Sequence, residues 1–337
     1  MLERIAQTLR VPAADLDEFA ALSALGIDSL TAVELRSWVQ GDLDVELAVE
    51  QMFTTPGIRE LAVAVDRLLG GASSADTDRV GTDTVEGSGQ WIVFPQPRPE
   101  AGSRLICFPY AGGGASAFKD WAEVLPEDVE LCIVQMPGRE ERLRETLLTD
   151  MTAVTDVLSK ELSAYTDKPF AFLGHSMGAI IAYEVACRLR AMGAAPMRHL
   201  FLSSRAAPQL QDNSEPLRFL DNEAFIERLH GLYGAVPDSI RQSVELQKVF
   251  LPILRADVTL LETYEPEEVE PLECAVTAFG GVDDPAITSA MLAGWQERTS
   301  AGFAQHEFPG GHFYIHAERD AVVALIVERL LDPALAG

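Results

Sequence analysis

Residues Phe170–Ala179 read FAFLGHSMGA, and this stretch decides the fold of the larger part of the chain. Its first four residues form an apolar run typical of a buried strand, and a helical pattern of apolar residues follows Gly178. The Gly-x-Ser-x-Gly pattern between them indicates a sharp turn from strand to helix, which raises a serine hydroxyl above a sheet. Glycines flank this serine because side chains there would collide with neighbouring backbone. The stretch therefore predicts an α/β fold with Ser176 as a nucleophile.

Short apolar runs alternate with amphipathic segments on both sides of this turn. We expect strands at Leu105–Phe108, Leu131–Gln135, Phe170–Leu173, Leu200–Leu202 and Ala275–Phe279, and helices at Thr152–Ala164 and Ile180–Met192. Such alternation predicts a mostly parallel sheet with helices on both faces. The segment from about 208 to 268 departs from this rhythm because its pattern is mostly helical. We expect it to be a helical lid inserted over the catalytic end of the sheet.

A serine nucleophile needs a base, and the chain has six histidines. His312 is our candidate because the sequence FPGGHF at 308–313 places it on a glycine-rich loop after a strand and before the last helix. Loops at the carboxyl ends of parallel strands are where such a fold assembles its active site. The other five are assigned to the turn itself, a strand, the lid and the surface (His175, His199, His230, His306 and His316).

The acid of a Ser-His-Asp triad should lie between Ser176 and His312 in this chain order. The sequence FGGVDDP at 279–285 supplies two aspartates directly after an apolar strand. An ordinary turn or a helix cap would explain either aspartate if it stood alone. With a serine and a histidine in place we choose Asp284, which directly precedes the proline, over Asp283.

A second glycine-rich loop follows the strand in LICFPYAGGG, residues 105–114. A phosphate-binding loop is the alternative, but no Gly-Lys-Ser/Thr pattern follows it. In a serine hydrolase such a loop supplies the second N–H group of the oxyanion hole. We therefore expect the backbone N–H groups of Ala111 and Met177 to hold the oxyanion.

The N-terminal residues 1–69 have the pattern of a small helical unit. Helices are expected near Leu2–Leu9, after Asp28, and at Ile58–Leu69. Residues 70–90 change to Gly, Ser, Thr and Asp with few apolar side chains, which predicts a flexible linker before a larger domain at 91–337. Within the first unit, LGIDSL at 25–30 resembles a plain helix N-cap when it is viewed alone.

Four separated motifs make the larger domain similar to a known family. FPYAGGGASAF at 108–118, MPGREER at 136–142, GHSMGA at 174–179 and FPGGHF at 308–313 resemble the type II thioesterases of polyketide and nonribosomal peptide synthesis. The resemblance extends from about Trp91 to Leu331. It implies an α/β-hydrolase fold, a helical lid, and hydrolysis of acyl thioesters on carrier proteins by Ser176, His312 and Asp284. Members of that family usually stand alone, whereas this domain follows another one.

The first unit resembles the acyl carrier proteins of modular polyketide synthases. Its LGIDSL motif is followed by VELR at 33–36 and MFTTP at 52–56, as in such carriers. The resemblance implies a four-helix bundle with 4′-phosphopantetheine attached covalently to Ser29. It also implies three partners: a polyketide or other acyl thioester as substrate, a phosphopantetheinyl transferase, and upstream synthase modules.

Composition narrows the classes further. The 337 residues are 47% hydrophobic and 23% charged, with a net charge of −26, which argues against nucleic-acid binding. No apolar run is long enough for a membrane span and no secretory signal is recognised, so we expect a cytoplasmic protein. The four cysteines are scattered without metal-ligand spacing, so no metal is expected.

These features predict a thioesterase that forms an acyl-serine intermediate and releases a finished chain by hydrolysis. Editing of stalled or misprimed carriers and release by cyclisation are the alternatives within the same chemistry. A non-catalytic module that presents the carrier to other enzymes is the alternative from a different class.

Overall fold

The computed structural model describes residues 5–6, 16, 29–43, 45, 47, 57–69, 90–210 and 215–331. In the N-terminal unit these include helices α2 (Ser29–Leu43) and α4 (Ile58–Leu69). Residues Ile58, Leu61 and Val65 recur at helical spacing and are buried, which explains the helix predicted there. Most of the helix expected near Leu2–Leu9 lies outside the described residues. The linker expected at 70–90 also lies outside them, except for its last residue. The expected bundle of four helices falls partly on residues that are not described.

A small core holds the described parts of this unit together. Its buried members come from both helices and from the short segments beside them: Ile5, Leu35, Val39, Val45, Leu47, Ile58, Leu61 and Val65.

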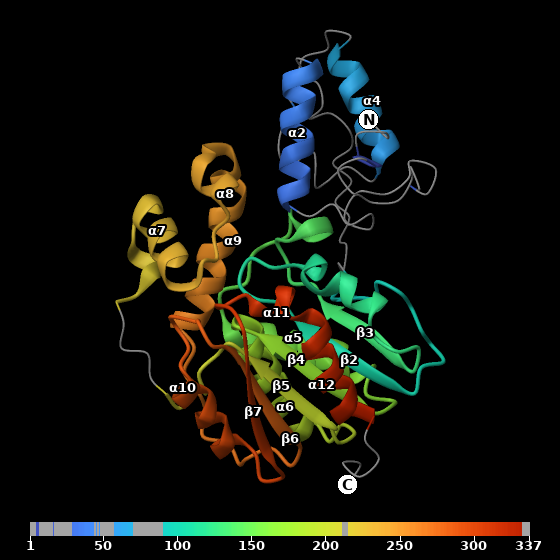
Figure 1. Cartoon of the computed structure of the whole chain (residues 1–337), viewed down its shortest axis with the longest axis vertical. Helices are drawn as coiled ribbons and strands as arrows, with labels where there is room; N and C mark the ends of the chain where they lie inside the picture. Colours follow the sequence, from blue (N-terminus) through green and yellow to red (C-terminus); the bar gives the residue numbers. More distant parts are fainter. Residues whose placement is uncertain are drawn as a thin grey trace.

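The larger part contains, among the described residues, a seven-stranded sheet in the order β1-β3-β2-β4-β5-β6-β7 (Figure 1). The strands are β1 (Ile92–Val93), β2 (Ser103–Phe108), β3 (Val129–Val134), β4 (Phe170–His175), β5 (His199–Ser203), β6 (Ala275–Gly281) and β7 (Phe303–Phe308). All neighbouring pairs are parallel except β1 with β3. The mostly parallel sheet predicted from the sequence is confirmed.

The central strands are buried and mostly apolar because both faces of the sheet are covered. Every residue of β2, β3, β4 and β5 is buried. Alternate residues of β2 enter opposite cores: Ile106 and Phe108 pack in one, Leu105 and Cys107 in the other. The edge strand β7 has a half-polar pattern, and Phe308 is its one buried residue.

Helices form a layer on each side of the sheet. The first core contains side chains of α5 (Met151–Ser163) and α6 (Met177–Ala191). The second contains side chains of the 3₁₀ helix η3 (Ala115–Glu123) and of α12 (Arg319–Leu331). Shorter elements complete this part: η4 (Glu140–Arg142), α10 (Ser289–Ala293), η6 (Gly294–Arg298) and α11 (Tyr314–Ala317).

Between β5 and β6 the chain forms a separate helical group, which we call the α7–α9 insertion (Leu217–Glu262). It comprises η5 (Leu217–Phe219), α7 (Asn222–Tyr233), α8 (Asp238–Gln242) and α9 (Val244–Glu262). These helices share their own buried cluster, which includes Phe225, Leu246 and Leu254. In Figure 1 they stand beyond one end of the strands, in yellow and orange.

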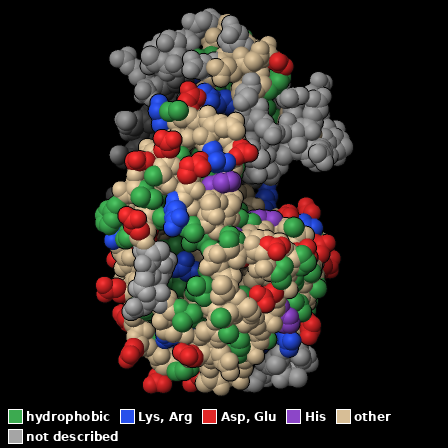
Figure 2. All heavy atoms as spheres, turned by 60° about the vertical axis from the view of Figure 1, so that its left-hand side comes forward, with side chains coloured by type: hydrophobic (Ala, Val, Ile, Leu, Met, Phe, Trp, Pro, Cys, Tyr) green, Lys and Arg blue, Asp and Glu red, His purple; other side chains and the backbone are tan. Residues whose placement is uncertain are grey.

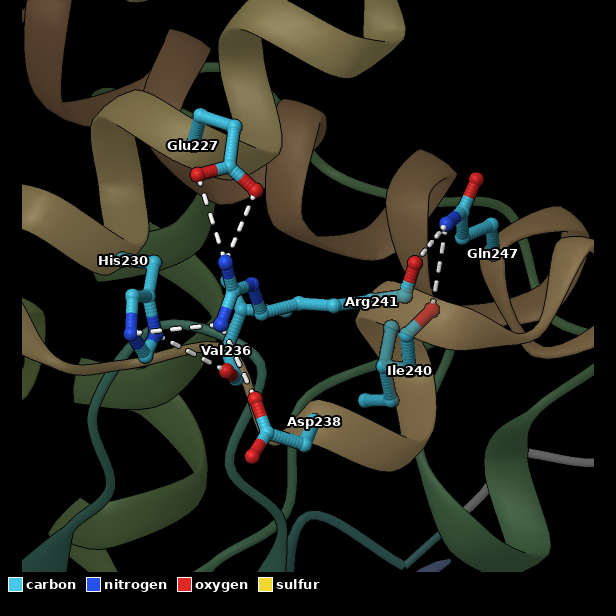
Figure 3. Close-up of polar contacts among 7 residues, drawn as sticks. All are labelled: Glu227, His230, Val236, Asp238, Ile240, Arg241 and Gln247. Carbon is cyan, nitrogen blue, oxygen red and sulfur yellow. Dashed lines mark hydrogen bonds and ion pairs between the residues drawn. The ribbon is translucent and has the colours of Figure 1, made fainter.

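Arg241 joins the three helices of the insertion (Figure 3). Its guanidinium donates to Glu227 of α7 at 2.9 Å and to Asp238 of α8 at 2.9 Å. Gln247 of α9 donates to the carbonyl groups of Ile240 and Arg241, at 3.1 and 2.9 Å. These bonds connect the end of α8, a helix too short to be stable alone, to the two longer helices beside it.

Outside the site, charge is spread over the surface. Figure 2 shows Asp and Glu side chains scattered over the visible face.

An ion pair joins Arg36 of α2 to Glu245 near the start of α9. Within the described ranges we find no helix with the length and apolarity that a membrane crossing requires.

Candidate active site

Ser176 lies in the turn between β4 and α6, at the carboxyl end of a central strand. Its φ of 54° and ψ of −115° are strained for a residue with a side chain. A Cβ atom on Gly174 would lie 2.3 Å from the carbonyl oxygen of Gly178. One on Gly178 would lie 2.0 Å from the carbonyl oxygen of Phe108, the last residue of β2. The glycines are therefore required by close backbone packing, which also brings the end of β2 against the start of α6.

Three loops bring their polar side chains into one hydrogen-bonded chain. His312 Nε2 lies 3.0 Å from Ser176 Oγ, and His312 Nδ1 lies 2.8 Å from Asp284 Oδ2. The loops follow β4, β6 and β7, so the three residues meet at the carboxyl edge of the sheet. The side chains of His312 and Asp284 are 2% and 0% exposed. Burial strengthens this hydrogen bond because water does not compete for its partners.

Asp284, and not Asp283, is the aspartate that faces His312. Its other oxygen, Oδ1, accepts hydrogen bonds from the backbone N–H groups of Ala286 at 3.0 Å and Ile287 at 3.2 Å. Asp283 is exposed, and its backbone N–H donates to the carbonyl of Gly310 at 2.9 Å. The neighbouring aspartate therefore fastens the two loops together, while Asp284 is oriented toward the histidine.

His175 belongs to a second buried chain beneath the first. Its Nδ1 lies 2.8 Å from Ser203 Oγ, which lies 2.7 Å from the hydroxyl of Tyr314. Burial lowers the pKa of His175 well below its usual value, so the ring stays neutral. Its ring centroid is 5.4 Å from that of His312. A neutral ring at this distance does not repel the positive charge that His312 would carry after taking a proton.

The glycine-rich loop after β2 forms a tight turn. The N–H of Gly113 donates to the carbonyl of Tyr110 at 2.9 Å, and Gly112 has a φ of 77°. Within the described residues, the backbone N–H groups of Ala111 and Met177 donate to no other protein group. These groups follow the carboxyl ends of the neighbouring strands β2 and β4, and such N–H groups are available to a developing negative charge.

Sequence reasoning missed the residues that hold this loop in place. The N–H of Ala115 donates to Gln135 Oε1 at 2.6 Å, and that of Ser116 donates to Glu140 Oε1 at 3.0 Å. The N–H of Gly112 donates to Asp257 Oδ2 at 2.7 Å. The run of charged residues in the motif MPGREER could have indicated a role for Glu140. No local sequence pattern indicates one for Asp257.

The α7–α9 insertion also reaches His312. The Tyr233 ring, at the end of α7, lies with its centroid 4.7 Å from that of His312. In the sequence Tyr233 is one of several apolar residues of that segment, so its place at the site depends on how the insertion packs.

At Ser29 the structure describes the backbone alone, and the residue is the first of α2. The N–H groups of a helix's first turn have no partner within the helix, and an anion is stabilised beside them. The position therefore fits a phosphodiester. Nowhere in the described residues do three His, Cys, Asp or Glu side chains come together in a way that would hold a metal ion.

Comparison with known proteins gives the family of each part. A family model described as "Thioesterase domain" matches residues 103–330, and one described as "Phosphopantetheine attachment site" matches residues 1–65. The chain belongs to the thioesterase family. This thioesterase is a hydrolase of thioester bonds with the α/β-hydrolase fold, and a phosphopantetheine attachment domain precedes the hydrolase on the same chain.

Relatives of the thioesterase come from peptide and polyketide biosynthesis. The gramicidin S biosynthesis protein GrsT of Aneurinibacillus migulanus is 38% identical over 72% of this chain and 94% of its own. RedJ, a thioesterase from the prodiginine pathway of Streptomyces coelicolor, is 35% identical, with a TM-score of 0.64 over 74% of this chain and 100% of its own. The type II thioesterase BorB from the borrelidin cluster is 33% identical, with a TM-score of 0.64 over 71% of this chain and 96% of its own.

The comparisons bear out the resemblances stated above for both parts of the chain. The substrate of the thioesterase is therefore an acyl thioester on a carrier, and 4′-phosphopantetheine is held covalently on a serine of the attachment domain.

Proposed function

We propose that Ser176, His312 and Asp284 are the catalytic triad of this thioesterase. The observation that carries the proposal is the continuous chain of hydrogen bonds from Asp284 Oδ2 through His312 to Ser176 Oγ, at 2.8 and 3.0 Å. With Asp284 accepting from Nδ1, His312 keeps its proton on Nδ1 and its lone pair on Nε2. Nε2 is then ready to take the proton of Ser176.

The backbone N–H groups of Met177 and Ala111 form the oxyanion hole. Met177 opens α6, so the positive end of the helix adds to its N–H group. Loss of one such donor lowers kcat by about 10²–10³.

The reaction proceeds by two acyl transfers. Ser176 Oγ bonds to the thioester carbonyl carbon while His312 takes its proton, and the carbon–sulfur bond breaks as His312 returns that proton to the leaving thiolate. His312 then takes a proton from water, whose oxygen attacks the acyl-Ser176 ester. The free acid departs, and Ser176 regains its proton from His312.

Ser29 is the attachment residue in this proposal. A phosphopantetheinyl transferase would load it, and upstream synthase modules would supply the chain. The group, when bound, presents the acyl chain to the hydrolase as a thioester. Because both domains share one chain, the effective concentration of substrate is around millimolar, and weak affinity between the domains suffices.

The outcome that we favour is hydrolytic release of a finished polyketide. It is supported by the presence of an attachment site at 1–65 and a thioesterase at 103–330 on the same chain. Editing of carriers is the second candidate, because BorB is described as a type II thioesterase.

We also place the protein in the cytoplasm. The four cysteines, Cys107, Cys132, Cys187 and Cys274, are all buried free thiols, as is usual in a reducing compartment.

Loading defined acyl groups onto the whole chain and following its intact mass tests these proposals. For a release enzyme, a long acyl chain leaves faster than acetyl, and it appears in solution as the free acid. Equal or faster loss of acetyl, together with equal hydrolysis of acyl groups on a separate carrier, would favour editing. The variant S176A should retain every acyl group, and S29A should show no mass increase with the transferase.

A further inference from the structure

Asp257 is a buried carboxylate with no role in the triad. It lies in the third quarter of α9, and its side chain is 0% exposed. A buried charge is unfavourable unless other groups neutralise it and donate hydrogen bonds to it. Its partners therefore indicate why an acid occupies this position.

Both partners of Asp257 belong to loops beside the active site. Its Oδ2 accepts a hydrogen bond from the backbone N–H of Gly112 at 2.7 Å. The same oxygen forms an ion pair with Arg139, whose side chain is 3% exposed. Gly112 is 145 residues distant in sequence and Arg139 is 118 residues distant. Asp257 thus joins the α7–α9 insertion to the loops after β2 and β3.

Hydrogen bonds hold the Arg139 side chain in one position, so its positive charge lies next to Asp257. Its Nη1 donates to the carbonyl of Pro137 at 2.7 Å, and its own carbonyl accepts from Gln135 Nε2 at 3.2 Å. Gln135 also accepts from the N–H of Ala115 in the glycine-rich loop. The pair of Arg139 and Asp257 is therefore continuous with the other bonds that hold this loop.

The Gly112 N–H is one residue from the N–H that we assign to the oxyanion hole. Within the turn, the Tyr110 carbonyl accepts from Gly113. A carbonyl and the N–H of the same trans peptide point in opposite directions, so this bond directs the Ala111 N–H away from Gly113. The internal bond sets the shape of the turn, whereas the bond to Asp257 sets its position. A flip of the peptide between Ala111 and Gly112 would turn a carbonyl toward the carboxylate, which Asp257 disfavours.

A packing contact supports the same connection. A Cβ atom on Gly112 would lie 2.8 Å from Leu254 Cδ2, one turn before Asp257 on α9. The helix therefore touches the turn directly at this residue and also bonds to it.

We propose that Asp257 is a positioning residue that holds the oxyanion loop from α9, with its charge neutralised by Arg139. The proposal rests on the proposed function, because it takes Ala111 as an oxyanion donor. The insertion then contributes to turnover through this contact of α9.

The test compares D257L, which removes the acceptor, with D257N, which keeps an oxygen for the Gly112 N–H. Each is assayed for kcat and KM on an acyl-pantetheine thioester and for inhibition by a trifluoromethyl ketone analogue, whose adduct with serine places an oxyanion in the hole. We expect D257L to lower kcat about 10²-fold, close to the loss of one oxyanion donor, with KM nearly unchanged. The affinity for the ketone should fall in parallel. D257N should stay within about tenfold of the parent, since a neutral acceptor remains.

Two further variants separate positioning from folding. Removing one partner of a buried pair can unfold a protein, so the double variant R139M/D257L removes both charges together. It should fold and show the same loss of kcat and ketone affinity as D257L. E262L is the matched control, because Glu262 on the same helix accepts backbone N–H bonds from Leu217 and Arg218 instead. It should leave the ketone affinity unchanged.

The outcomes distinguish this proposal from the one on which it rests. If D257L and the double variant keep parental kcat and ketone affinity while S176A is inactive, Asp257 has no positioning role. An equal loss of ketone affinity in E262L would also overturn it. Activity that persists in S176A would overturn the proposed function itself.

Discussion

Replacement of Asp284 by asparagine changes almost nothing in shape, yet we expect it to stop turnover. Asp284 Oδ1 accepts from two backbone N–H groups, those of Ala286 and Ile287, and Oδ2 faces His312. In D284N the amide oxygen must stay on the side of the two N–H donors. The NH₂ group is then forced to face His312 Nδ1.

This orientation imposes the wrong tautomer on the histidine. Nδ1 must accept from the asparagine NH₂ group, so the proton moves to Nε2, which points at Ser176 Oγ. A protonated Nε2 takes no proton from the serine. The same replacement in a serine protease triad lowers kcat about 10⁴-fold, which corresponds to about 5.4 kcal/mol of activation free energy.

The assay is release of free thiol from an acyl-pantetheine thioester by D284N, with D283N as the matched control. Asp283 is exposed and fastens its loop through its backbone N–H, so D283N should keep parental kcat. D284N should also keep the parental thermal midpoint to within a few degrees. The reasoning fails if D284N retains more than a tenth of the parental kcat, or if D283N is the variant that loses activity.

Three other predictions concern stability. In G178A the new Cβ collides with the backbone of Phe108, so we expect a loss above about 3 kcal/mol in denaturant unfolding; G231A, whose Cβ would have no neighbour within 4 Å in α7, should gain up to about 1 kcal/mol. S203A leaves two buried polar partners unpaired and should lose about 2–6 kcal/mol, and an unchanged unfolding midpoint would contradict that. Burial lowers the pKa of His199 to about 4, so the unfolded chain takes up a proton that the folded chain refuses. The free energy of unfolding therefore keeps its full value above pH 6.5 and falls by about 3 kcal/mol as the pH decreases to 4. The variant H199F should lack this part of the loss of stability in acid.

Much of the sheet was predictable because its central strands are buried on both faces and therefore read as continuous apolar runs. Each strand range that we expected lies within or within one residue of a strand in the structure. The antiparallel β1 was not predicted because it has two residues. A strand was expected before the loop of His312, but its bounds were not predicted because β7 has the half-polar pattern of an edge.

The candidate site divides in the same way. Ser176 could be predicted from the short motif of a strained turn, and His312 from a short glycine-rich loop. Both signals lie in consecutive residues of the sequence. The choice of Asp284 over Asp283 needed the proline that follows it. Asp257 and Tyr233 act through contacts of the α7–α9 insertion with distant loops, and such packing leaves no local signature in the sequence.

The α7–α9 insertion leaves β5 and returns to β6, and these strands are direct neighbours in the sheet. The two strands are parallel, so the chain leaves the sheet at one edge and re-enters it at the other. The ends of the insertion itself meet, because Glu262 at the end of α9 accepts hydrogen bonds from the backbone N–H groups of Leu217 and Arg218, and the segment could therefore be exchanged as one unit. A chimera that received this segment from a relative would change the residues beside His312, Tyr233 among them, and keep the sheet. We expect the graft to keep full turnover only if it brings a hydrogen-bond acceptor for the Gly112 N–H to the place of Asp257, and an acid there would also neutralise the recipient's Arg139.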